Sequence, residues 1–155
     1  SHGFVASALF LSIGVVYDRH HTRMVSYYGG LVHTMPLYVF IFLFFTMSNI
    51  GLPGTGSFVG EFLILTGSYK VNTSITFLGA TGMVIGGCYS LWLFNRVCYG
   101  NLKTQYFTAY SDISKREFFI FLPLLVGTLV MGLYPEIFLE SIHMSVNLLI
   151  ELMYF

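Results

Sequence analysis

The stretch that decides the fold is NIGLPGTGSFVGEFLIL, which runs from Asn49 to Leu65. Its first half combines a proline with three glycines, and this combination is the strongest local signal for a break in regular structure. Its second half is apolar or small at every position except Glu61. The pattern predicts a helix that is interrupted just before an apolar helical segment, and that segment carries a single carboxylate.

The composition of the whole chain places this stretch in a membrane. Hydrophobic residues make up 55% of the 155 positions, charged residues make up only 9%, and the mean hydropathy is +0.75. Soluble domains carry about 25% charged residues, so this chain has too few charges to cover a surface in water, and lipid is the expected solvent. The formal net charge is zero, which excludes the basic excess that is typical of nucleic-acid-binding proteins.

Turns and polar loops divide the chain into six apolar segments. Most are apolar on all sides rather than alternating, which favours helices immersed in lipid or protein over transmembrane strands. The fold prediction is therefore all-α, a polytopic transmembrane helix bundle forming a single membrane domain over residues 1–155. The predicted segments are 3–17, 36–52, 57–69, 74–99, 118–134 and 137–155.

Two of these segments differ from an ordinary membrane span. Segment 57–69 is shorter than the roughly 20 residues that cross a bilayer, and a short segment after a Gly/Pro break predicts a discontinuous helix around Glu61. The last segment contains two carboxylates and a histidine and is expected at a bundle edge or at the membrane surface; these are Glu140, His143 and Glu151.

The chain opens inside an apolar helix, SHGFVASALF, without an initiator methionine or the basic start of a signal peptide. We therefore expect it to be a fragment of a longer membrane protein, either the product of a split gene or part of a larger chain.

Glu61 is the strongest candidate for function. A charged side chain at the bilayer centre costs about 2.5 to 3.5 kcal/mol, and such residues usually face a protein interior or a water-filled cavity on an ion or proton path. The alternative is that Glu61 lies near the membrane interface and pairs there with a basic residue.

Histidine is the other proton-transfer candidate, because its ordinary titration range includes neutral pH. His2 precedes a small-residue helix start, whereas His20, His21 and His33 lie in or near a loop. Taken alone, a histidine at this position is more often a satisfied core or terminal residue with a structural role than a proton-transfer group. The histidines, carboxylates and two cysteines do not have the spacing of a metal site, a disulfide framework or an iron–sulfur cluster. The glycine-rich GATGMVIGG, residues 79–87, is interpreted as a surface for close helix packing rather than a nucleotide loop.

Several stretches together resemble one family. They are SHGFVASALF, YDRHHTR, YYGGLVHTMP, GLPGTGSFVGEFLIL, YSLWLFNRVCYG, SDISKREFFIFLPLL and MGLYPEIFL. Across nearly the whole chain these resemble the C-terminal portion of the subunit 4 family of mitochondrial NADH dehydrogenase, the antiporter-like membrane subunits of respiratory complex I. The earlier helices of that family, with their lysines and glutamate, have no counterpart here.

The resemblance implies a core membrane-arm subunit of NADH:ubiquinone oxidoreductase, which contributes part of a proton-translocation pathway coupled to NADH oxidation and quinone reduction. It implies enzyme activity only as a subunit, with no cofactor in this chain and with FMN and iron–sulfur clusters in other subunits. The implied partners are the N-terminal part of the same subunit, other membrane-arm subunits and lipids, in the mitochondrial inner membrane as a multi-pass protein.

The resemblance also assigns roles to two residues. Glu61 resembles the titratable residue on the broken late helix, which ends the central proton relay of the subunit. His2 resembles the histidine on the preceding helix, which hands protons toward it. The two are far apart in the sequence, so only tertiary packing can bring them together. The alternatives are a stand-alone cation/proton antiporter and a purely structural scaffold.

Overall fold

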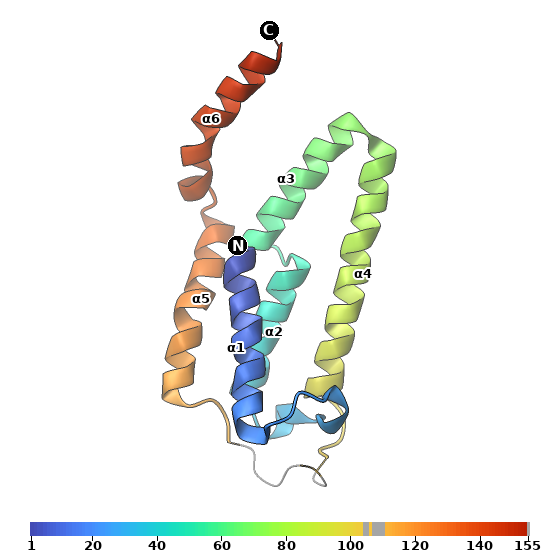
Figure 1. Cartoon of the computed structure of the whole chain (residues 1–155), viewed down its shortest axis with the longest axis vertical. Coiled ribbons are helices and arrows are strands. Elements are labelled where there is room, and N and C mark those ends of the chain that lie inside the picture. The colour runs from blue at the N-terminus through green and yellow to red at the C-terminus, as the bar shows by residue number, and fades with distance from the viewer. Residues whose placement is uncertain (104–105, 107–110, 155) are drawn as a thin grey trace.

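The computed structural model describes residues 1–103, 106 and 111–154, and the regular structure of this part is entirely helical (Figure 1). Each of the six predicted segments falls on one α-helix, and the all-α prediction is confirmed. Part of the loop 100–117 and the last residue of segment 137–155 lie outside the described residues. The helices are α1 (His2–His20), η1 (Val25–Tyr27), η2 (Leu31–His33), α2 (Pro36–Ile50), α3 (Gly56–Val71), α4 (Thr73–Cys98), α5 (Lys115–Leu133) and α6 (Glu136–Tyr154).

The predicted interruption lies between α2 and α3. Gly51 ends α2 in the left-handed conformation (φ 89°), and the N–H of Leu52 donates back to the carbonyl of Met47 at 3.0 Å. This is the usual glycine-terminated helix end. Gly54 also has a positive φ, of 95°, and the chain then becomes extended at Thr55 before α3 begins. The discontinuous helix near Glu61 is confirmed.

The two halves of the broken span are α2 and α3. In Figure 1, α3 continues upward from the top of α2, and α4 returns along the whole length of both. A sharp turn at Asn72 joins α3 to α4, and the side chain of Asn72 caps α4 by accepting from the N–H groups of Ser74 (3.0 Å) and Ile75 (3.2 Å). The chain therefore reverses after 57–69, and 57–69 pairs with 36–52 in the broken span.

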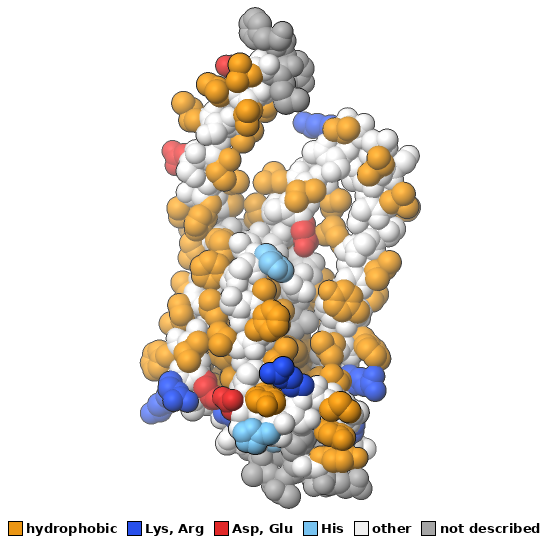
Figure 2. Space-filling view, in the orientation of Figure 1, with side chains coloured by type: hydrophobic (Ala, Val, Ile, Leu, Met, Phe, Trp, Pro, Cys, Tyr) orange, Lys and Arg blue, Asp and Glu red, His pale blue; other side chains and the backbone are white. Residues whose placement is uncertain are grey.

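This topology brings the polar loop 21–35 and the described parts of the loop 99–114 to the same end of the bundle. All seven Lys and Arg residues fall in the described part of the chain, and Lys70 alone lies at the opposite end (Figure 2). We call the end with the two loops the basic end. Its basic residues are Arg19, Arg23, Arg96, Lys103, Lys115 and Arg116.

The core of the bundle surrounds α2. Phe45 is completely buried, and its ring lies 6.3 Å from that of Phe121 on α5. One turn earlier, Phe42 faces Phe94 of α4, with ring centroids 5.6 Å apart. Tight apolar packing of this kind is what holds helices together where lipid supplies no hydrophobic driving force.

Hydrogen bonds at the basic end connect α1, α2 and α5. Arg19, in the last turn of α1, donates to both carboxylate oxygens of Glu117 on α5 at 3.0 and 2.8 Å, and also to the carbonyls of Ser111 and Asp112. The Asp112 carboxylate accepts from the N–H groups of Leu37 and Tyr38 and so caps the start of α2. We call this cluster, made of Arg19, Asp112 and Glu117, the Arg19 staple, because it joins three helices.

The outer faces of the bundle are apolar. Within the described residues, α4 and α5 are long and apolar enough to cross a membrane, and α2 is a shorter apolar helix. Large hydrophobic side chains such as Phe77, Trp92 and Phe119 are more than half exposed. Helix α6 extends beyond the rest of the bundle, and its polar side includes His143, whose ring contacts the Asn147 amide at 3.2 Å.

Candidate proton-transfer site

Glu61 lies in the second turn of α3, and its side chain reaches back to the helix break. A Cβ added to Gly51 would collide with the Glu61 carboxylate, so the carboxylate packs directly against the end of α2. Its Oε2 atom is buried and has no hydrogen-bond partner among the described residues. An unsatisfied carboxylate oxygen at this depth needs either a proton, a water molecule or a group from outside this part of the protein.

A cavity of about 350 Å³ adjoins the carboxylate. Its walls come from the end of α2, from Glu61 and from one face of α4. The lining residues are Asn49, Ile50, Glu61, Gly79, Gly82, Met83, Gly86, Gly87 and Tyr89. Since one water molecule occupies roughly 30 Å³ of liquid, a cavity of this size has room for several. We call it the Glu61 cavity.

The glycines of α4 create this space. A Cβ at Gly79 or Gly82 would meet no atom within 4 Å, whereas a Cβ at Gly87 would lie 3.3 Å from the side chain of Ile50. The interpretation of residues 79–87 as a close-packing surface is therefore confirmed at Gly87, whereas Gly79 and Gly82 meet no other helix of this chain. At those two positions the missing side chains leave room for the cavity instead of letting a helix of this chain approach.

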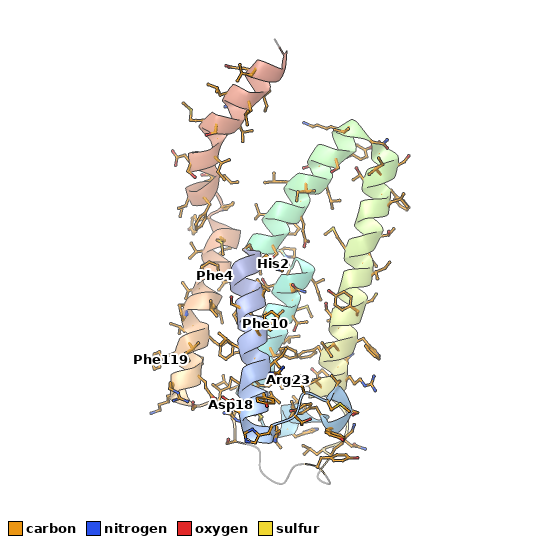
Figure 3. The ribbon with its side chains drawn as sticks, viewed as in Figure 1. His2, Phe4, Phe10, Asp18, Arg23 and Phe119 are labelled. Carbon is orange, nitrogen blue, oxygen red and sulfur yellow. The ribbon has the colours of Figure 1, made fainter. Side chains whose placement is uncertain are left out.

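The start of α1 lies beside the start of α3. The hydroxyls of Ser1 and Ser57 are 3.1 Å apart, and Figure 3 shows His2 at the end of α1 next to the first turn of α3. Glu61 is one helical turn beyond Ser57. The fold thus brings the elements that carry His2 and Glu61 together, although no hydrogen bond or ion pair joins the two residues in the described part of the chain.

Helix α5 holds the break in position. A Cβ at Gly132 would clash with the backbone of Gly54, and a Cβ at Gly56 would lie 2.8 Å from the Cβ of Met131. The glycines on both sides therefore allow α5 to lie directly against the interrupted backbone. Because Ser1 also touches this region, α1 and α5 together orient α3 and with it the Glu61 carboxylate.

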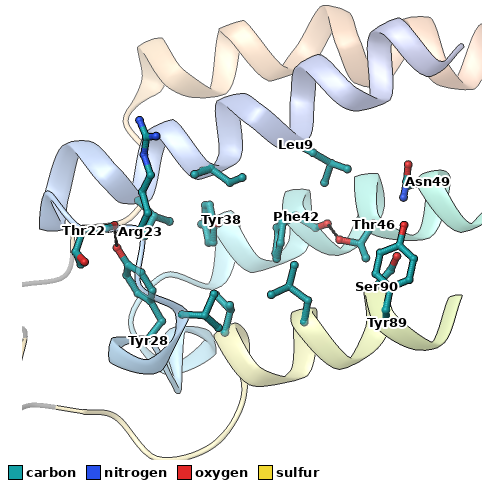
Figure 4. Close-up of a pocket in the computed structure, with 15 residues that line it drawn as sticks. Leu9, Thr22, Arg23, Tyr28, Tyr38, Phe42, Thr46, Asn49, Tyr89 and Ser90 are labelled. Atoms are coloured by element: carbon teal, nitrogen blue, oxygen red, sulfur yellow. Dashed lines mark hydrogen bonds between the residues drawn. The ribbon is translucent and has the colours of Figure 1, made fainter. Parts of the chain in front are cut away.

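A second cavity, of about 380 Å³, lies between α1, α2 and α4 (Figure 4). We call it the inner cavity. Asn49 and Tyr89 line both cavities. The middle of the inner cavity is apolar, and its far end contains Arg23 and Tyr28, whose hydroxyl donates to the carbonyl of Thr22 at 2.7 Å.

Sequence reasoning did not select Asn49 or Tyr89. Asn49 did give a signal, since it is the one amide in the apolar segment 36–52 and stands directly before the break. Tyr89 gave none, because tyrosines are common in this chain and only the packing of α4 against α2 places this one beside Asn49.

The other candidate ligands do not form a metal centre. Among the described residues there is no group of three or more His, Cys, Asp or Glu side chains that could hold an ion. His20, His21 and His33 lie at the basic end, where the ring of His21 contacts that of Tyr17. Both cysteines are free thiols; Cys88 is exposed and Cys98 is buried.

Comparison with known proteins assigns the chain to a family. Residues 1–88 match the family described as NADH:quinone oxidoreductase/Mrp antiporter, TM. The chain is 56% identical over 151 residues to NADH-ubiquinone oxidoreductase chain 4 of Marchantia polymorpha, and 48% identical over 151 residues to NADH-quinone oxidoreductase subunit M of Rhodobacter capsulatus. Each alignment covers 97% of this chain and 30% of the relative.

A solved structure agrees with these relatives. The fold superposes on a chain of respiratory complex I from Thermus thermophilus with bound NADH, with a TM-score of 0.80 and 27% sequence identity. The match covers 90% of this chain and 29% of that chain. The chain thus spans less than a third of the length of the relatives it matches, and the resemblance to the subunit 4 family is confirmed. This chain belongs to the family of membrane subunits shared by NADH:quinone oxidoreductases and Mrp antiporters.

Proposed function

We propose that this chain is part of a membrane-arm subunit of a proton-translocating NADH:ubiquinone oxidoreductase, and that Glu61 carries protons within it. The observation that supports the proposal most directly is the position of the Glu61 carboxylate. It lies at a helix break, has a buried oxygen without a partner in the described residues, and faces a cavity with room for water. Broken helices in membrane transporters place ion and proton sites at the interruption for the same reason.

The chemistry requires only that the carboxyl group alternates between two protonation states. The protonated carboxyl can donate a hydrogen bond to water in the Glu61 cavity or to a carbonyl that the helix break leaves without an intrahelical partner. The ionised carboxylate can be solvated by water in the Glu61 cavity. His2 belongs to the same site in our proposal and exchanges protons with Glu61 through water, since the two side chains are not in direct contact.

The other parts of the proposed enzyme cover the exposed surface of this chain and carry the redox cofactors. We place the N-terminal part of the subunit and the neighbouring membrane-arm subunits against the exposed apolar faces of α3 and α4, with lipid on the remaining surface. The location proposed is the mitochondrial inner membrane, which follows from the proposed membership of this chain in an NADH:ubiquinone oxidoreductase. FMN and the iron–sulfur clusters are assigned to other subunits, so electron transfer takes place away from this chain and proton transfer takes place within it.

The test is Glu61→Gln in the assembled complex. This change keeps the size of the side chain but removes its ability to bind and release a proton at ordinary pH. Proton pumping per NADH oxidised, measured by a pH-sensitive dye in sealed membrane vesicles, is expected to fall about tenfold or more, because positioned proton-transfer groups contribute about 10² to 10⁴ in rate. The amount of complex on native gels is expected to stay the same.

The matched control is Glu140→Gln. Glu140 is an exposed carboxylate on α6 that lines neither cavity, so its loss should leave pumping unchanged. Full pumping by the Glu61→Gln complex would reduce this chain to a structural scaffold. Cation exchange by the subunit reconstituted without the rest of the complex would favour a stand-alone antiporter instead.

A further inference from the structure

Two residues outside the proposed Glu61–His2 pair stand where the two cavities meet. Asn49, in the last turn of α2, and Tyr89, on the facing side of α4, line both the Glu61 cavity and the inner cavity. Figure 4 shows them close together, with Thr46 and Ser90 beside them. Any water that leaves the Glu61 cavity toward the inner cavity passes these side chains first.

The chemistry of the two residues differs. A tyrosine hydroxyl both donates and accepts a hydrogen bond, so it can take a proton from one neighbour while it gives its own to another. The Asn49 amide does not exchange protons in this way, but it has two donors and one acceptor and can hold water in a fixed orientation. Tyr89 is therefore suited to relay a proton, and Asn49 is suited to position the water through which it moves.

Two hydroxyls extend this polar group into the inner cavity. Thr46 donates to the carbonyl of Phe42 at 2.6 Å, and Ser90 donates to the carbonyl of Gly86 at 2.8 Å. Because both hydroxyl protons are used within their own helices, their oxygen atoms remain as acceptors directed by the helix geometry. They can therefore accept hydrogen bonds from Tyr89 or from water next to it.

Beyond these hydroxyls the inner cavity becomes apolar. Leu9 and Ile13 of α1, Phe42 of α2 and Leu93 of α4 line its middle section, before the polar end at Arg23. Water is poorly held between such side chains. The polar group around Tyr89 thus lies between the Glu61 cavity and this apolar section.

We propose that Tyr89 and Asn49 extend the Glu61 proton site into the inner cavity, with the Tyr89 hydroxyl as a proton relay and the Asn49 amide as a positioning residue. This inference rests on the proposed function of Glu61. In the transfer, the Glu61 carboxyl loses its proton to a cavity water, that water gives a proton to the Tyr89 oxygen, and the Tyr89 hydroxyl releases its original proton to water held by Thr46 and Ser90. Tyrosine ends as it began, the Glu61 carboxylate holds one negative charge, and the water beside Thr46 and Ser90 holds the transferred proton.

The decisive variant is Tyr89→Phe in the assembled complex, because it removes only the hydroxyl and leaves the ring. Proton pumping per NADH is expected to fall about tenfold, toward the loss expected for Glu61→Gln, since both remove a group on one proton path. The matched control is Tyr69→Phe. Tyr69 is 61% exposed, as Tyr89 is, but it lies at the end of α3 and lines neither cavity, so its variant should pump normally.

The double variant separates a shared path from an independent effect. If Tyr89 acts on the Glu61 proton, the Glu61→Gln/Tyr89→Phe complex should pump no worse than the Glu61→Gln complex, because two changes in one path are not additive. Independent losses that multiply would overturn the inference. Normal pumping by Tyr89→Phe beside a defective Glu61→Gln would overturn the inference alone, whereas normal pumping by Glu61→Gln would overturn the proposed function of Glu61 and the inference with it.

Asn49 is tested by two substitutions. Asn49→Leu keeps the approximate volume but removes the hydrogen-bonding groups, and pumping is expected to fall severalfold. Asn49→Ser restores a donor and an acceptor, and it is expected to recover most of the pumping although it packs less well. A purely structural role for Asn49 predicts the opposite order, with the leucine variant closer to the unchanged protein, and that order would remove Asn49 from the inference.

Discussion

At the scale of single residues, Gly51 controls where the Glu61 carboxylate lies. Its φ of 89° favours glycine, and a Cβ there would occupy the position of the carboxylate. Gly51→Ala is therefore expected to cost about 1 to 2 kcal/mol in backbone strain and also to displace Glu61 from the end of α2. Native gels should show somewhat less complex, and proton pumping by the complex that does assemble should fall.

Gly54→Ala distinguishes these two effects. Gly54 has a similar φ of 95°, but a Cβ there would meet nothing within 4 Å. Its substitution should therefore lower the amount of complex to a similar extent while the assembled complex still pumps. Equal pumping in the two variants would show that the contact between Gly51 and the carboxylate does not matter for proton transfer.

At the scale of secondary-structure elements, the Arg19 staple joins α1, α2 and α5. The side chains of Arg19 and Glu117 are only 13% and 14% exposed, so Arg19→Gln leaves a mostly buried carboxylate without its cation. Removing one partner of a buried ion pair costs about 3 to 5 kcal/mol, and we expect about 2 to 3 kcal/mol here because some solvent reaches both groups. Thermal denaturation of the purified complex should show lower stability for this chain.

The control for the staple is Arg116→Gln, in the same first turn of α5 as Glu117. Arg116 is exposed, and the structure describes no ion pair for it, so this change should have little effect on stability. Arg19→Lys should fall between the two, because lysine keeps the charge but not the two parallel hydrogen bonds to Glu117. A stable Arg19→Gln complex would mean that the apolar contacts of α1 are sufficient without the staple.

At the scale of the whole molecule, the fold determines which loops share a side of the membrane. Six of the seven Lys and Arg residues lie at the basic end, and basic loops remain on the internal side of a membrane. We therefore predict that the basic end faces the mitochondrial matrix. In a Cys88→Ser background, Val71→Cys should react with an impermeant maleimide from outside the inner membrane, whereas Met24→Cys and Lys115→Cys should react only in inside-out vesicles.

The labelling experiment also tests the broken span directly. Labelling of Met24→Cys and Lys115→Cys from opposite sides would contradict the pairing of α2 with α3. The three positions suit the purpose because Val71 is 88% exposed, Met24 is 56% exposed and Lys115 is exposed at the start of α5.

The amino-acid sequence by itself determined the class of the fold and the position of its main interruption. Apolar segments that lack the alternation of a transmembrane strand form helices in lipid, because a helix satisfies its backbone groups within its own segment. The glycines and the proline of 51–56 end one helix and start another through local backbone geometry, which needs no tertiary contact. Glu61 was identifiable for the same reason, since an isolated carboxylate in such a segment is costly wherever the segment packs.

Tertiary structure alone decided which segments form the broken span, where the loops lie and what surrounds Glu61. A break does not reveal whether the chain continues or reverses, and only the packing of α3 on α4 and α5 shows that it continues. The Glu61 cavity depends on α4 glycines that face α3 without touching it, and the link to the inner cavity depends on Asn49 and Tyr89 meeting across two helices. Arg19 and Glu117 are 98 positions apart. Contacts over such separations depend on the register of whole helices against one another, and a nearly uniform apolar surface carries no local pattern that specifies this register.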